Sequence, residues 1–350
     1  MAFIIEDSSQ KQHLNLSKMA YAILERDMET FGEKTKSGMV NRIFENFRED
    51  AEASMSIALE KRRHELEEVL KSISLSLPNY DKVLKVFLKE REKFLQEKAA
   101  SYPKAITLKI RINNGNLEYL TEEGQECKED KYYNSRAGKY IKAVIEEYAR
   151  LPYIEREKIY YKDRFDTLER AINEKRQLKI TIKEGVVVKI KPYAILTDPM
   201  SMYHYIVGIY SGEQYCLNEK QESFSFRISS FSTVRLLQEK SFISNAKQKM
   251  LEDEIRNKGV QFMSGELHSF KVILTDVGMK MYKRILHLRP EYYSEEEVQD
   301  GTCLEFLCTR EQMLYYFLKF GAEAKIISPD EMVQEFASHY KKANALYNQT

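Results

Sequence analysis

The segment MYHYIVGIY, residues 202–210, alternates in the manner of a β-strand and lies between two predicted turns. Alternation places Tyr203 and Tyr205 on one face of the strand and His204 on the other. Neither face is clearly polar, which predicts a central strand of a sheet. A buried strand with three tyrosines and a histidine in nine residues needs an explanation, which the surrounding sequence supplies.

From about residue 161 the chain changes from helical to strand-forming sequence. A helix with Phe165, Leu168 and Ile172 on its apolar side is predicted first. Five short strands follow it and together favour a small closed barrel of the SH3 or Sm-like kind. The predicted strands are LKITIK (178–183), VVVKIKPYAIL (186–196), MYHYIVGIY (202–210), QYCL (214–217) and FSFRISSFSTVRLL (224–237).

Four motifs of this region resemble the WYL-domain family in order and spacing: LERAINEKRQLKI, KIKPYAIL, HYIVG and SFRISSFSTV. The family's Trp-Tyr-Leu triplet reads His204-Tyr205-Ile206 here, and Ser230 replaces the second of two family arginines. The resemblance assigns residues 161–240 to a WYL domain. It implies a groove that receives nucleic acid or a nucleotide-like ligand.

Aromatic side chains stack on any base, at about 1–3 kcal/mol per base, beside a positively charged groove that follows the backbone. The resemblance implies a groove formed by Arg227, Tyr193, His204, Tyr205, Lys189 and Lys191. Residues 161–237 hold 12 basic and 9 acidic residues, which is the sign expected of such a site. Taken singly, the tyrosines are also typical of barrel packing, and His204 of a hydrogen-bonded interior residue.

The C-terminal third alternates predicted strands, SFKVILTD, GTCLEFLC and AEAKIIS, with helices. A capping box at Thr309 and Gln312 opens one of these helices. The stretch YYFLKFGAEAKIISPDEM (315–332) resembles the C-terminal extension found behind WYL barrels. The resemblance assigns residues 241–350 to a small α+β extension, which in that family helps to join two chains.

The first fifty residues contain a short strand pattern, QHLNLSK, followed by two amphipathic helices. Gly32 lies in the usual position past a helix end. The pattern resembles the ribbon–helix–helix family over residues 11–48 and assigns residues 1–50 to such a module. Because an isolated strand leaves its edge hydrogen bonds unmade, the resemblance implies a homodimer whose two chains pair their ribbons.

In that family, ribbon side chains enter the DNA major groove and the second helices bind phosphates at their N-termini. The corresponding residues are His13, Asn15 and Ser17 for DNA bases, and Lys36 and Ser37 for phosphates. Residues 1–50 hold 7 basic and 9 acidic residues, however. The module is therefore also consistent with dimerisation without DNA binding.

Residues 51–160 are predicted to hold a helical hairpin and a strand–helix connector. A long helix over 51–77 ends at Pro78, and DKVLKVFLKEREKFLQEK forms its partner. The strand AITLKIRI (105–112) and the later helix SRAGKYIKAVIEEYARL repeat the order of the first module. A degenerate second ribbon–helix–helix copy is one interpretation, and its strand would compete with a second chain for the first ribbon.

The chain has 350 residues, 31% of them charged, and a net charge of +1. This balance excludes nucleic-acid binding by a bulk positive field, so any such site is a local patch. No signal peptide and no apolar run of 18 residues occurs, so we expect a cytoplasmic protein with no membrane partner. The four cysteines form no CxxC pair and are expected to be reduced thiols.

Motifs of the common enzyme classes are missing from the sequence. It has no Gly-rich phosphate loop, no HExxH, no zinc-like Cys/His spacing and no Arg-x4–6-His ribonuclease motif. We therefore expect a protein that is not an enzyme and that uses no cofactor or metal.

The predicted fold class is multidomain α+β: ribbon–helix–helix, helical region, five-stranded WYL barrel and α+β extension. This combination resembles the WYL accessory proteins encoded beside the type VI-D CRISPR effector, an RNA-guided ribonuclease. The leading hypothesis is a homodimeric, non-catalytic binder of single-stranded RNA that stimulates the effector. The alternatives are a DNA-binding transcriptional regulator whose WYL domain senses a ligand, and an oligomeric scaffold with an empty barrel.

Overall fold

The computed structural model describes residues 3, 10–72, 80–121, 127–182, 185–197, 203–212, 222–263 and 265–348. The chain divides into two compact units, Met1–Lys162 and Asp163–Thr350. The predicted strand QYCL and one of the four cysteines, Cys216, lie outside the described residues.

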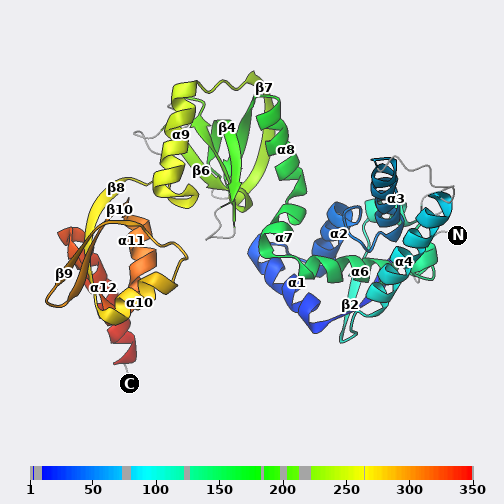
Figure 1. The fold of residues 1–350 in the computed structure, drawn as a ribbon, viewed down its shortest axis with the longest axis horizontal. Coiled ribbons are helices and arrows are strands. Elements are labelled where there is room, and N and C mark those ends of the chain that lie inside the picture. The colour runs from blue at the N-terminus through cyan, green and yellow to red at the C-terminus, as the bar shows by residue number, and fades with distance from the viewer. Residues whose placement is uncertain are drawn as a thin grey trace. The chain divides into compact units, whose positions relative to one another are not determined.

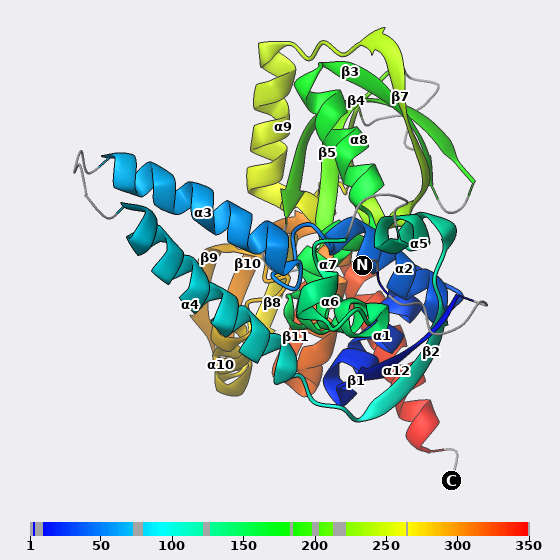
Figure 2. The same ribbon diagram turned by 90° about the vertical axis from the view of Figure 1, so that its right-hand side faces the viewer.

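The first unit is helical apart from one two-stranded ribbon (Figure 1). Its helix α6 is the most buried element and contacts β1, α1 and α2. The helices α3 and α4 form a long hairpin that extends from the rest of the unit (Figure 2). The elements are β1 (Lys11–Leu16), α1 (Lys18–Phe31), α2 (Lys36–Phe47), α3 (Met55–Ser72), α4 (Tyr80–Ala100), β2 (Ile106–Arg111), α5 (Asn114–Thr121), α6 (Ala137–Arg150) and α7 (Tyr153–Tyr160).

The ribbon is made within one chain. Strand β1 pairs antiparallel with β2, in a register that runs from Lys11 opposite Arg111 to Leu16 opposite Ile106. Leu14 and other apolar side chains of both strands are buried beneath the ribbon. The first strand therefore does not require a second chain, contrary to the prediction, because β2 of the same chain provides the missing hydrogen bonds.

Local signals set the ends of the first two helices. The Ser17 hydroxyl accepts a hydrogen bond from the Ala20 amide at 3.1 Å and caps α1. Gly32 ends the helix with a φ of 73°, a left-handed conformation that glycine adopts without strain. Thr35 caps α2 by accepting from the Gly38 amide.

The second unit contains a five-stranded antiparallel sheet with strand order β6-β5-β4-β3-β7. Its elements are α8 (Lys162–Asn173), β3 (Arg176–Ile182), β4 (Val187–Thr197), β5 (His204–Tyr210), β6 (Ser223–Arg227), η3 (Ile228–Ser230), β7 (Phe231–Lys240), α9 (Asn245–Lys258) and η4 (Val260–Phe262). The last predicted strand is two strands, separated by the turn η3, where the Ser230 hydroxyl donates to the Arg227 carbonyl at 2.6 Å. Within the described residues β6 and β7 are edges that do not pair with each other, so the expected closed barrel is an open sheet.

Strand β5 is central, as its sequence predicts, and is buried on both faces. Helix α8 covers one face of the sheet and helix α9 the other (Figure 1). Gly208 lies so close to β4 that a Cβ there would meet the Lys191 carbonyl oxygen at 2.2 Å, which only glycine avoids. The two covering helices explain why neither face of the segment is polar.

A second antiparallel sheet follows, with strand order β11-β8-β10-β9. Helices α10, α11 and α12 contribute to one apolar core with this sheet. Thr309 caps α11 by accepting from the Gln312 amide at 3.2 Å, which is one half of the predicted capping box, whereas the Gln312 side chain donates to the Leu288 carbonyl at 3.3 Å. Strand β9 was not anticipated, because its sequence YYSEEEV has no apolar alternation. The elements are β8 (Leu267–Leu274), α10 (Asp276–Arg284), β9 (Tyr292–Val298), β10 (Gly301–Thr309), α11 (Arg310–Phe317), β11 (Ala324–Ser328) and α12 (Asp330–Tyr347).

Candidate nucleic-acid interface

Five of the six predicted groove residues share the α9 face of the five-stranded sheet. Arg227 lies directly opposite Tyr205 in the register of β6 and β5, so both side chains leave the sheet on the same side. His204 leaves on the other side, where its ring meets Phe165 of α8 edge-on at 4.8 Å. His204 therefore packs beneath α8, away from the other five.

The aromatic members of the predicted groove are engaged inside the fold. Tyr205 is 9% exposed and packs in an apolar cluster with Leu251 of α9 and Met263. The Arg227 guanidinium lies 3.2 Å from the centre of the Tyr203 ring, a cation–π contact. The structure thus places Tyr205 in the interior, where its ring offers no open face to a base.

Tyr193 occupies the bulge of β4 and faces α9. Its hydroxyl donates to Glu252 Oε1 at 2.8 Å, and this bond to a carboxylate raises the pKa of Tyr193. Tyr193 is therefore held against α9 by a side-chain hydrogen bond.

The open part of this face carries a row of cations across three neighbouring strands. Lys179 on β3 lies directly opposite Lys189 on β4 and directly opposite Arg235 on β7. Lys191 follows two residues after Lys189 and so shares this face. We call Lys179, Lys189, Lys191 and Arg235 the cation row. Lys179 and Arg235 are exposed and were not among the predicted site residues.

Like charges placed directly opposite each other destabilise a sheet. One carboxylate offsets part of this cost, because Glu239 of β7 accepts from Lys189 Nζ at 2.9 Å, which lowers the pKa of Glu239. No other ion pair of the cation row occurs among the residues that the structure describes. The row thus retains an excess of positive charge on an open strand surface, which suits an extended polyanion.

The predicted groove is therefore divided into two places. Arg227 lies level with the end of β4, whereas Lys189 lies near its start, roughly 20 Å away at about 3.3 Å per residue. The first place is an aromatic and guanidinium cluster against α9, and the second is the cation row. Residue types alone could not separate them, because strand register decides which side chains are neighbours.

The ribbon of the first unit has an exposed polar face. His13 and Asn15 point outward, as predicted, and lie opposite Lys109 and Thr107. Asn15 Oδ1 accepts from the Thr107 hydroxyl at 2.8 Å. With Lys11 and Arg111, which form the next outward pair, this ribbon face carries cations and no carboxylates.

The three other residues assigned to DNA contact are engaged within the fold. Ser17 is 6% exposed, and its amide and hydroxyl both donate to Glu146, at 2.6 Å and 2.8 Å. Lys36 pairs with Glu25 at 2.8 Å, a bond that raises the pKa of Lys36 and lowers that of Glu25. The Ser37 hydroxyl accepts from the amide of β2 residue Arg111. Ser17 in particular has no surface for a base, contrary to its predicted role.

Comparison with solved structures identifies a match over the whole chain. A crystal structure described as that of a "CRISPR Cas-related protein" has a TM-score of 0.77 and 22% sequence identity, over 99% of this chain and 96% of the other. The two chains share one fold. Proteasome accessory factor B/C (PafBC) of Arthrobacter aurescens has a TM-score of only 0.29 at 12% identity, over 75% of this chain and 36% of that one. No protein-family model and no curated protein matches the chain.

The described part of the chain contains neither a metal-binding cluster nor a membrane-spanning helix. No group of three or more His, Cys, Asp or Glu side chains is placed to hold a metal ion. None of the helices with described residues combines the length and the apolar character that crossing a membrane requires. That the protein is not an enzyme and uses no cofactor stays a prediction.

Proposed function

We propose that this chain is a non-catalytic accessory protein of a CRISPR system that binds single-stranded RNA along the cation row. The observation that carries the proposal is the register that aligns Lys189, Lys179 and Arg235 across three strands. Adjacent strands lie about 4.8 Å apart, so the row offers closely spaced cations to a phosphate backbone. The full-length likeness to a CRISPR Cas-related protein supports the biological setting.

The role of the aromatic cluster in this proposal is secondary. Arg227 and Tyr203 lie at the other end of the same face. A single-stranded RNA that ran along the sheet from the cation row would reach them after passing α9. Stacking on Tyr203 would add affinity without sequence preference, because every base has an aromatic face. The cation row supplies the electrostatic attraction in either case.

The test compares RNA affinity in two double variants. Lys179→Ala/Arg235→Ala removes two exposed cations of the row, and Lys341→Ala/Lys342→Ala removes two exposed lysines of α12 as the matched control. Each phosphate contact on a single strand contributes about −0.7 to the slope of log affinity against log salt, so the first variant should flatten that slope by roughly 1.4. The control should leave it unchanged. Equal effects of both variants would show that only net charge matters and would contradict the proposal.

The effector is the finer part of the proposal. We infer that the bound RNA is the substrate of an RNA-guided ribonuclease of type VI-D, and that a homodimer of this protein increases its cleavage through two RNA-binding surfaces acting on one strand. Cleavage by that effector should rise when this protein is added and should not rise with Lys179→Ala/Arg235→Ala. Full stimulation by the variant would separate effector activation from RNA binding and refute the mechanism.

Transcriptional regulation is the second candidate, and the outward ribbon face favours it. Lys11, His13 and Asn15 of β1 and Lys109 and Arg111 of β2 form a cationic surface that suits the DNA major groove. Lys109→Ala/Arg111→Ala should then abolish duplex DNA binding and leave RNA binding intact. Weak binding that neither this variant nor the sheet variant changes would leave the scaffold hypothesis.

A further inference from the structure

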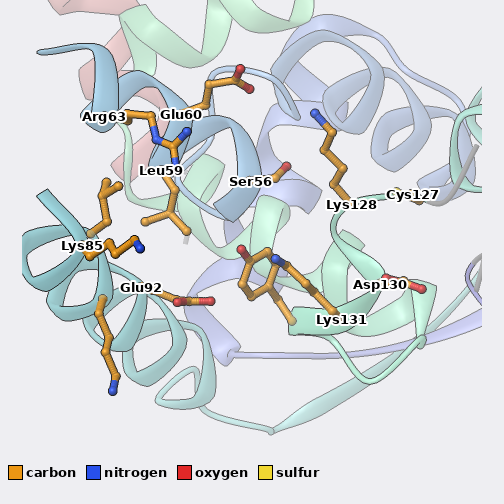
Figure 3. A pocket seen from close by; sticks show the side chains of 13 residues that line it. Ser56, Leu59, Glu60, Arg63, Lys85, Glu92, Cys127, Lys128, Asp130 and Lys131 are labelled. Carbon is orange, nitrogen blue, oxygen red and sulfur yellow. The ribbon is translucent and has the colours of Figure 1, made fainter. Parts of the chain in front are cut away.

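A concave site in the first unit has no part in the proposed function. The cavity has a volume of about 810 Å³, which lies within the range of nucleotide- and drug-sized ligand pockets. It is formed between α3, α4 and the segment 127–132, and Figure 3 shows the side chains that line it. We call it the hairpin pocket.

Helical spacing brings two stripes of side chains to the hairpin pocket. On α3 the lining residues Ser56, Leu59, Glu60 and Arg63 follow the i, i+3, i+4, i+7 pattern of one helix face. On α4 the lining residues Lys85, Leu88, Lys89 and Glu92 follow the same pattern. One face of α3 and one face of α4 therefore direct polar side chains and one leucine each toward the hairpin pocket.

Cations outnumber acids around this space. The five basic lining residues are Arg63, Lys85, Lys89, Lys128 and Lys131, and the three acidic ones are Glu60, Glu92 and Asp130. Lys85 and Lys131 extend toward the space from opposite sides (Figure 3). Lys131 Nζ also lies 4.6 Å from the centre of the Tyr132 ring. Positive groups from three separate segments thus converge on one concavity.

Charges of the same hairpin that do not line the pocket form ion pairs within the fold. Arg91 and Lys98 both bind Glu52, and Lys98 also binds Glu147 at 3.1 Å. These ion pairs join α4 to Glu52, which precedes α3, and to Glu147 of α6. The pairing raises the pKa of Lys98 and lowers that of Glu52.

Four of the five cations of the hairpin pocket are not paired in this way; the fifth, Lys131, has its pKa raised by the Tyr132 hydroxyl and by nearby carboxylates. No ion pair with a described carboxylate is formed by these four residues, which are Arg63, Lys85, Lys89 and Lys128. Lys85 and Lys89 are moreover like charges four residues apart on one helix, an arrangement that destabilises a helix slightly. Carboxylates of the protein could have neutralised these cations but do not. Unpaired cations around a cavity therefore indicate that an anionic ligand binds there.

We propose that the hairpin pocket binds the phosphate groups of a nucleotide, either free or at the end of an RNA strand. Ammonium and guanidinium groups form charge-assisted hydrogen bonds with phosphate oxygens. Leu59, Leu88 and the Tyr132 ring provide apolar surface for a base, and the carboxylates of Glu60 and Glu92 accept hydrogen bonds from ribose hydroxyls or base amino groups. The assignment rests on residues of the first unit alone and stands apart from the cation row.

The test uses ATP and inorganic pyrophosphate as probes, with binding measured by calorimetry on the full chain. Lys85→Glu/Lys89→Glu reverses two pocket cations, and Lys82→Glu/Lys93→Glu reverses two exposed lysines of α4 that do not line the pocket. Because charge reversal removes charge-assisted hydrogen bonds to phosphate, the pocket variant should lose affinity tenfold or more, and the control variant should lose little. Lys128→Ala, from the third segment, gives an independent reduction without altering the hairpin.

The two sources of phosphate are separated with RNA. A 5′-triphosphorylated oligonucleotide is compared with its 5′-hydroxyl form in the Lys179→Ala/Arg235→Ala background, so that RNA held by the sheet does not contribute. Preference for the triphosphate end identifies RNA as the source, and saturable ATP binding without that preference identifies a free nucleotide. Absence of saturable binding by every phosphate probe, or equal loss in the control variant, overturns the proposal whether or not the sheet binds RNA.

Discussion

Asp27 is fully buried in the first unit and has two partners there. Its carboxylate accepts from Arg156 Nε at 2.6 Å and Nη2 at 3.1 Å, and from the Tyr148 hydroxyl at 2.8 Å. Arg156 is only 3% exposed, so removal of Asp27 leaves a guanidinium buried without its charge partner. Breaking such a pair costs about 3–5 kcal/mol.

We therefore expect Asp27→Ala to lower the free energy of unfolding of the first unit by that amount, measured by urea titration with helical circular dichroism. Glu65→Ala is the control, because its partner Arg62 is exposed and such pairs contribute at most about 1 kcal/mol. If the two variants were equally stable, the buried ion pair would have no structural role.

At the scale of single residues, the sequence predicts which side-chain types lie on a strand face better than it predicts how exposed they are to solvent. Alternation predicts that Lys189 and Lys191 share one face of their strand, and in the structure both are half-buried on that face, while their role in binding stays a prediction. The aromatic face of Tyr205 predicts a stacking site, but α9 covers it, and no property of the strand itself reveals a helix from later in the chain. Lys179 and Arg235 were missed because only the register of β3 with β7 aligns them.

At the scale of elements, the cation row makes stability and binding oppose each other. Lys179 lies between Lys189 and Arg235, so Lys179→Glu would replace two repulsive cross-strand contacts by two attractive ones. Each such pair contributes roughly 0.2–1 kcal/mol. We expect this variant to unfold at a higher temperature than the native protein and to bind single-stranded RNA more weakly.

The measurement combines calorimetric unfolding with RNA titration on the same samples. Lys179→Gln separates removal of the charge from its reversal, and its effects should fall between those of the native protein and the glutamate variant. A variant that is less stable and binds RNA normally would show that the row serves the sheet rather than a ligand.

Elements with strong local signals were predictable, and their partners were not. Local signals predict that one helix ends before Gly32 and another begins after Thr309, as α1 and α11 do, because such signals act within a few residues. Strand pairing is non-local, so the sequence predicts a closed barrel where β6 and β7 are edges of the described sheet. The acidic edge strand β9 has no apolar pattern at all, since its side chains are largely exposed.

At the scale of the whole molecule, the ribbon changes how a homodimer must be explained. Both strands come from one chain, so dimerisation is not needed to complete the first unit. The proposed homodimer then depends on a surface other than the ribbon pairing. Dilution should therefore dissociate the dimer without unfolding the ribbon.

The same register also offers a direct test of which chain supplies each ribbon strand. Asn15 and Thr107 lie opposite each other with their side chains in hydrogen-bond contact, so Asn15→Cys/Thr107→Cys places two thiols within reach of a disulfide. Oxidation should cross-link a single chain, and the product should migrate as a monomer on a denaturing, non-reducing gel. Asn15→Cys alone controls for the native cysteines. A covalent dimer that appears only in the double variant would mean that the ribbon is exchanged between two chains, and the dimer would then be built on the ribbon.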